Sequence, residues 1–306
     1  MHKRQISRRE FLRLSALTAA GAVLAGCKQT PATVEPAKET VAAPTKEETQ
    51  PTAAPASKYS EAPMLAGMGL PPVDERLPEE PMVIQPVDSL GEYGGTWHRA
   101  FLGVADFHAL GRLIYESVLR WPRDTKDAIQ PGLAESWEWA DDGKALTLNF
   151  RKGLKWSDGA PFTVDDIIFW WEYIELDPEL SINPHAEYMV NDKPMELEKV
   201  DDYTIRLRFD APNGLILRML AFHGNQWPLN FERFGFFAPK HYLTEFRPKL
   251  NKEMADYTLF NEKVDDYNPE RPTLTPWPVS EWGTGANKLV AGRNPYYWKI
   301  DPEGQQ

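Results

Sequence analysis

The side chains of this 306-residue sequence that could carry covalent or metal chemistry are few and far apart. Cys27 is the only cysteine, and it follows directly on an apolar run. Neither a Gly-x-Ser-x-Gly nor a His-Glu-x-x-His motif occurs, so the nucleophile, base and orienting group of a hydrolase are not recognisable. Beyond the first ten residues, histidines lack the close spacing that a zinc site needs; they are His98, His108, His185, His223 and His241. We therefore expect no enzyme, no metal site and no cofactor.

Two neighbouring carboxylates, Asp165 and Asp166, could in principle serve catalysis or bind a metal. Their position favours a structural role instead. Thr163 stands three residues before Asp166, which is the spacing of a helix capping box, and acidic residues in the first turn complement the helix dipole. We therefore predict that this pair starts a helix.

The sequence is rich in aromatic residues, with 11 tryptophans, 11 tyrosines and 14 phenylalanines. Most of these rings are expected to pack in the core. Aromatic clefts also bind sugars and peptides by stacking, so a minority of the rings is expected to contact a ligand.

The first 27 residues have the composition of an export signal. Basic residues, including the pair Arg8 and Arg9, precede an apolar run over 14–25 that is too short to span a bilayer, which takes about 20 residues. Ser-Arg-Arg-x-Phe-Leu resembles the twin-arginine export signal; an ordinary secretory signal is the alternative. Leu-Ala-Gly-Cys resembles a bacterial lipobox. We expect residues 1–27 to be the signal and Cys27 to carry a lipid that anchors the protein to a membrane.

The rest of the sequence divides by composition. Residues 28–80 are rich in Pro, Ala, Thr and Glu and are assigned to a disordered tether, whose composition is clearest up to about residue 60. The prolines of residues 61–90 are expected to wrap the surface of the domain. Residues 81–306 are expected to form the folded part. The formal net charge is −11, and such an acidic chain is not expected to bind nucleic acid.

Alternation and turn residues predict the main elements of the folded part. Two alternating runs on either side of Asp141-Asp142-Gly143 predict a β-hairpin, in which Leu146, Leu148 and Phe150 share one face. A helix is predicted from Thr163 to about residue 176, and strands over 96–102 and 203–209. Strands mixed with helices indicate an α/β fold.

Six short motifs occur in the order typical of one family, the family 5 extracellular solute-binding proteins, which serve ABC importers as receptors for peptides, nickel and oligosaccharides. The chain resembles this family over about residues 91–306. The motifs are Ile114-Tyr115-Glu116-Ser117-Val118, Pro131-Gly132-Leu133-Ala134-Glu135-Ser136-Trp137, Asp141-Asp142-Gly143, Phe150-Arg151-Lys152-Gly153-Leu154-Lys155-Trp156-Ser157-Asp158-Gly159, Pro161-Phe162-Thr163-Val164-Asp165-Asp166 and Asn294-Pro295-Tyr296-Tyr297-Trp298-Lys299.

The resemblance implies a periplasmic-binding-protein-like class II fold with two lobes that close over a solute. Members of the family are considerably longer, so only the first-lobe portion is expected here, with the sequence truncated before the second lobe. The family's Gly-Thr-Gly-Pro-Tyr is replaced by Gly283-Thr284-Gly285-Ala286-Asn287, a departure that affects the local strand and the preference for ligand.

The resemblance further implies that the exported, lipid-anchored protein captures an oligopeptide or an oligosaccharide and delivers it to ABC permease subunits. It would act on the outer face of the cell membrane or in the periplasm. Expected ligand-binding residues are Phe101 and Asp106, in the loop after the first strand, and Asn225, Trp227 and Trp282. Core packing or a turn is the alternative role for each. The rival functions are a surface interaction lipoprotein and a secreted hydrolase.

Overall fold

The computed structural model describes residues 57–102, 116–124, 126–180, 184–222, 235–265, 267–283 and 288–306. The export signal, Cys27, Arg8 and Arg9 lie outside these ranges, so their predicted roles stay predictions. Within the part of the chain that the structure describes, no helix is both long enough and apolar enough to cross a membrane.

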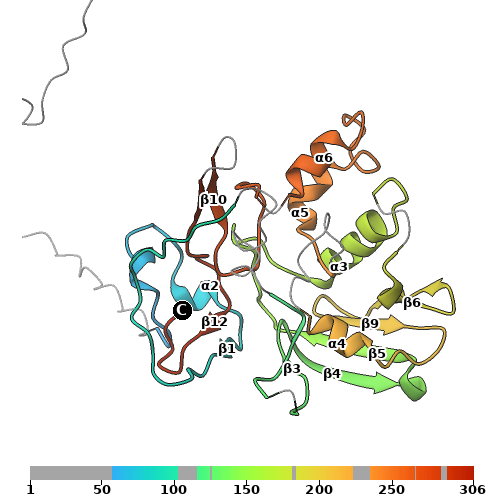
Figure 1. The fold of residues 1–306 in the computed structure, drawn as a ribbon, viewed down its shortest axis with the longest axis horizontal. Coiled ribbons are helices and arrows are strands. Elements are labelled where there is room, and N and C mark those ends of the chain that lie inside the picture. Colours follow the sequence, from blue (N-terminus) through green and yellow to red (C-terminus); the bar gives the residue numbers. More distant parts are fainter. Residues whose placement is uncertain are drawn as a thin grey trace, which may run out of the picture. The chain divides into compact units, whose positions relative to one another are not determined.

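The central element is a four-stranded antiparallel sheet with the strand order β4-β5-β9-β8 (Figure 1). Its strands are β4 (Ala134–Ala140), β5 (Ala145–Phe150), β8 (Glu196–Lys199) and β9 (Thr204–Arg208). The predicted hairpin is confirmed as β4 and β5, which are joined through Asp141, Asp142 and Gly143 in left-handed conformations. The predicted strand over 203–209 is confirmed as β9.

One face of this sheet forms the floor of the main core. Leu146, Leu148 and Phe150 are buried as expected, together with Ile205 and Leu207 of β9. Helix α3 (Val164–Trp170) covers that face and continues into a π-helical turn, η3 (Trp171–Glu175). The helix is therefore predicted correctly, except that its last turn is π-helical and not α-helical.

Short helices pack around the sheet and complete the core. Those after the sheet are α4 (Ile216–Leu220), α5 (Lys240–Leu243), η5 (Thr244–Phe246) and α6 (Thr258–Lys263). Short strands make three two-stranded pairs beside them: β2 (Leu119–Arg120) with β3 (Gln130–Pro131), β6 (Met189–Val190) with β7 (Lys193–Pro194), and β10 (Val279–Trp282) with β11 (Leu289–Ala291). A 3-10 turn, η4 (Ala186–Tyr188), leads into β6.

The start and the end of the described chain lie side by side. Strand β1 (Met82–Val83) pairs in parallel with β12 (Lys299–Ile300), and Ser60 bridges to Gln305. The segment before β1 contains η1 (Pro63–Leu65) and α2 (Val73–Arg76).

A buried arginine fastens this arrangement. Arg76 is fully buried; its Nη1 donates to Gln306 Oε1 at 2.7 Å and to the carbonyl of Pro295. Nη2 donates to Glu61 Oε2 at 2.8 Å, and Nε to the carbonyl of Pro71 at 3.0 Å. Residues 57–80 therefore belong to the folded part, and the expectation that the tether extends to residue 80 is wrong. The prolines of this segment introduce turns, so that the segment packs on the domain and does not run out as an extended tether.

A second correction concerns residues 96–102, which were predicted to form a strand. The segment has no regular secondary structure and no strand partner among the described residues. Two of its apolar residues stay accessible: Trp97 is 74% exposed and Leu102 is 98% exposed.

Candidate functional site

Two of the five predicted ligand-binding residues meet in the structure. The rings of Phe101 and Trp282 stack with their centroids 6.2 Å apart and an interplanar angle of 27°. Both side chains are half-buried. The other three, Asp106, Asn225 and Trp227, lie outside the described residues, so their predicted role is untested.

Tyr267 adds a third ring that the sequence analysis missed. Its ring centroid lies 4.3 Å from that of Trp282, with an interplanar angle of 24°. Tyr267 stands in a turn with no periodic pattern and no motif, so the only signal nearby was turn-forming Asp265 and Asn268. We refer to Phe101, Trp282 and Tyr267 together as the aromatic stack.

Trp282 is held by a short β-hairpin. It is the last residue of β10 and pairs with Leu289 of β11, and Gly283 N donates to the carbonyl of Lys288 at 2.8 Å. At the other end of β10, Val279 is buried and anchors the strand. The pairing of β10 with β11 thus fixes the backbone that carries the indole, and the indole ring stays partly exposed to solvent.

Tyr267 is held by hydrogen bonds of its own turn. The Tyr267 N–H donates to Asp265 Oδ1 at 2.7 Å, and the Asn268 side-chain amide donates to the carbonyl of Lys263 at 2.9 Å and to Tyr242 Oη at 3.0 Å. The last two bonds tie the turn to the end of α6 and to α5. Fixed aromatic faces of this kind bind the C–H face of a sugar ring or an apolar peptide side chain, at little cost in side-chain entropy.

Several described tryptophans pack in the core, as expected, and Trp137 and Trp139 pack against it. Trp156, Trp170, Trp171 and Trp298 are at most 4% exposed. Trp282 and the 46% exposed Trp121 are among those that keep accessible faces.

The sequence motifs at 114–118 and 294–299 contact each other directly. Glu116 Oε1 accepts from Tyr297 Oη at 2.6 Å and from Lys299 Nζ at 2.8 Å. Burial raises the pKa of Tyr297 well above its usual range, and the neighbouring Glu116 carboxylate adds to this. Burial also lowers the pKa of Lys299, although Glu116 opposes that change. These motifs therefore form a packing and ion-pair junction.

Asp166 caps α3, as the sequence predicts. Its Oδ2 accepts from Thr163 N at 3.0 Å and from Trp156 Nε1 at 3.2 Å, and its Oδ1 accepts from Lys240 N at 3.0 Å. Thr163 Oγ1 accepts from Asp165 N, which completes the box. Among the residues that the structure describes, no cluster of His, Cys, Asp and Glu could hold a metal ion.

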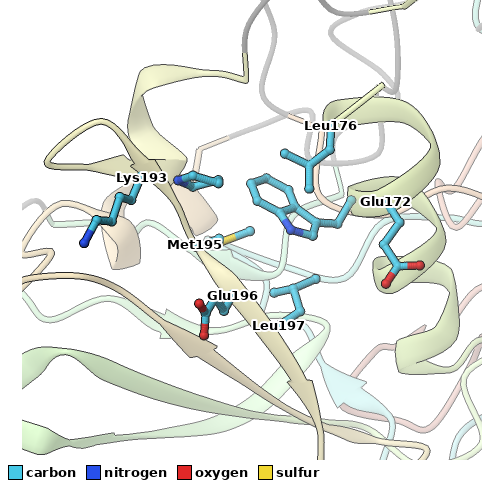
Figure 2. Close-up of a pocket in the computed structure, with 8 residues that line it drawn as sticks. Glu172, Leu176, Lys193, Met195, Glu196 and Leu197 are labelled. Atoms are coloured by element: carbon cyan, nitrogen blue, oxygen red, sulfur yellow. The ribbon is translucent and has the colours of Figure 1, made fainter. Parts of the chain in front are cut away.

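A separate hollow of about 450 Å³ lies between the π-helical turn η3 and strands β7 and β8 (Figure 2). Leu176, Met195 and Leu197 form apolar walls, and Glu172 and Glu196 stand at its edge. Lys193, also at the edge, is paired with Asp210 at 2.6 Å. The aromatic stack does not belong to this hollow.

The comparisons with known proteins agree with this architecture. Residues 128–305 match the model of bacterial extracellular solute-binding proteins, family 5, middle region. The periplasmic alpha-galactoside-binding protein of Rhizobium meliloti strain 1021 is 31% identical over 265 residues, which cover 78% of this chain and 35% of that protein.

Two solved structures superpose well. An oligopeptide-binding protein OppA gives a TM-score of 0.70 at 38% identity, covering 82% of this chain and 40% of OppA. The periplasmic binding protein MelB of Agrobacterium fabrum C58, in complex with stachyose, gives 0.68 at 29% identity, covering 81% of this chain and 39% of MelB.

The chain belongs to the family 5 bacterial extracellular solute-binding proteins. The expected α/β fold of the periplasmic-binding-protein type is confirmed by the two superpositions. The chain spans between about a third and two fifths of the length of these relatives.

Proposed function

We propose that this protein is the solute-capturing component of an ABC importer and that the aromatic stack forms part of its solute-binding surface. The observation that carries the proposal is the stacking of three partly accessible rings from three separate segments of the chain. Such a wall supplies affinity by contact and desolvation and needs no catalytic group. Binding without chemical conversion is therefore the activity proposed for the site.

The proposed solute is an oligosaccharide, with an oligopeptide as the second candidate. One relative is named for alpha-galactosides and a solved structure holds stachyose, whereas another relative is an oligopeptide-binding protein. The partly accessible surfaces of the stacked rings favour the flat C–H surface of a pyranose ring. A peptide would additionally need partners for its backbone amide groups.

Titration calorimetry with stachyose and with tetra-alanine tests this proposal. We expect one of the two to bind, and Trp282→Ala to weaken that binding about tenfold or more, because loss of a central aromatic contact costs roughly 1.5 kcal/mol or more. Trp121→Ala is the matched control, since this exposed indole lies outside the stack. Unchanged affinity in Trp282→Ala, or no binding of either solute, would contradict the proposal.

We also propose that the protein is exported and is held at the membrane by a lipid on Cys27. Replacement of Cys27 by Ser removes the acyl acceptor, so the protein should move from the membrane fraction to the soluble extracytoplasmic fraction. Conversion of Arg8 and Arg9 to lysine should leave unexported precursor, whereas Arg13→Lys should not. Membrane retention of the Cys27→Ser variant would show that the anchor lies elsewhere.

A further inference from the structure

A second hollow, of about 330 Å³, lies between the start of β2, the end of α4 and strand β12. We call it the β2–α4 pocket; its lining residues are Glu116, Ser117, Arg120, Trp121, Ala221, Phe222 and Lys299. Among its residues, Trp121 and Phe222 keep 46% and 40% of their surface exposed. The pocket therefore offers aromatic faces to a ligand, and none of its residues belongs to the aromatic stack.

The charges of this pocket do not cancel. Lys299 is paired with Glu116 at 2.8 Å, so these two charges neutralise each other. Arg120 has no carboxylate within ion-pair distance among the described residues; its Nη1 contacts only the thioether sulfur of Met82, at 3.3 Å. One guanidinium charge in the lining is thus uncompensated, in a chain whose net charge is −11.

The partly buried position of Arg120 strengthens the attraction of its guanidinium for an anion. Arg120 is half-buried, and its positive charge acts on two buried neighbours. It adds to the lowering of the Lys299 pKa by burial and opposes the raising of the Tyr297 pKa by burial. A guanidinium in such a partly desolvated position binds a carboxylate through charge-assisted, bidentate hydrogen bonds. A cationic ligand, in contrast, would meet an unopposed positive charge.

We propose that the β2–α4 pocket is a binding site for a small organic anion, namely a carboxylate that carries a planar apolar group. Arg120 binds the carboxylate, and Trp121 and Phe222 contact the apolar group. The site is distinct from the aromatic stack, and its existence does not depend on the proposed capture of an oligosaccharide or a peptide there.

The test uses two probes of the same size and shape, indole-3-acetate and indole-3-acetamide, titrated into the full chain; the first carries a carboxylate and the second a neutral amide. Indole-3-acetate should bind roughly ten- to a hundred-fold more tightly than the amide, which is the range expected for hydrogen bonds to a charged group. Arg120→Gln should abolish this preference, Arg120→Lys should retain part of it, and Trp121→Ala should weaken the binding of both probes.

Trp282→Ala is the control that separates this site from the aromatic stack, because it should leave indole-3-acetate binding unchanged. The thermal unfolding midpoint of every variant shows whether it is folded. Equal affinity for the two probes, or unchanged affinity in a folded Arg120→Gln variant, would overturn the proposal. Loss of indole-3-acetate binding in Trp282→Ala would place the anion in the stack instead.

Discussion

Gly132 is a residue whose identity follows from close backbone packing. A Cβ atom at this position would lie 2.7 Å from the carbonyl oxygens of both Ser117 and Val118. These oxygens accept hydrogen bonds from Leu133 N and Ala134 N, so they cannot move aside without loss of backbone bonds. The glycine in the Pro-Gly-Leu-Ala-Glu-Ser-Trp motif thus lets two chain segments approach.

Replacement of Gly132 by alanine is expected to lower the free energy of unfolding by about 1–3 kcal/mol, the usual cost of overpacking. Urea denaturation followed by circular dichroism measures it. Gly292→Ala is the control, because a Cβ there meets nothing within 4 Å; it should change stability by less than about 0.5 kcal/mol. Equal effects of the two substitutions would refute the packing argument.

Residue types alone could predict the role of some side chains but not of others. Thr163 and Asp166 are local partners three residues apart, so their capping role was predictable. Trp282 and Phe101 do stack on each other, but their role in ligand binding stays a prediction. The contact of Tyr267 with Trp282 joins segments that are distant along the chain and carries no local pattern. Likewise, the ion pair of Glu116 with Lys299 spans 183 residues.

At the scale of elements, Asp166 links the stability of α3 to pH. Burial raises the pKa of Asp166 to about 6, although the hydrogen bonds from Thr163 N, Lys240 N and Trp156 favour the charged form. The folded state therefore holds this proton more tightly than the unfolded chain, whose reference pKa is 3.8. The stabilisation is complete below about pH 4 and is lost as the pH rises through about 6.

Wild-type protein should accordingly lose about 2 kcal/mol relative to Asp166→Asn between pH 4 and pH 6. Denaturation of both proteins across this range measures the difference. Asp165→Asn provides a control of opposite sign, because the hydrogen bond from Lys199 lowers the pKa of Asp165. Relative to that variant, wild-type stability should rise as the pH increases from about 3 to 5. Parallel curves for Asp166→Asn and wild type would contradict the assignment.

Elements with a strong local period could be predicted, and those defined by distant partners could not. The β4–β5 hairpin, β9 and α3 each show regular alternation or capping, and the face of β5 predicted to be shared is buried. The segment 96–102 follows a glycine turn as a strand would, but it has no partner strand among the described residues, which a local pattern cannot reveal. The π-helical turn at the end of α3 also has no sequence signal that we recognised.

At the scale of the whole molecule, Arg76 connects the first and last described segments. Its partners Glu61, Pro295 and Gln306 come from both of these segments, and removal of the guanidinium leaves the buried side-chain carbonyl of Gln306 and the partly buried carbonyl of Pro295 without this donor. Arg76→Met should reduce the free energy of unfolding by about 2–4 kcal/mol, because each unpaired buried acceptor costs roughly 1–3 kcal/mol.

Hydrogen exchange locates this effect. Amide protection in Arg76→Met should fall first in residues 57–84 and 299–306, and later in the sheet of β4, β5, β9 and β8. Arg218→Ala, which removes an exposed arginine, should leave the pattern unchanged. A uniform loss of protection across the chain would show that the ends and the sheet unfold as one unit.

The pairing of β1 with β12 also determines when some native contacts can form during translation. Arg76 leaves the ribosome 230 residues before its partner Gln306. At about 5–20 residues per second, this interval lasts roughly 10–50 s. During that time the apolar side chains of Val73 and Leu77 lack Ile300, the residue that they pack against in the folded chain. The first described segment therefore completes these contacts only after more than 220 further residues have been synthesised.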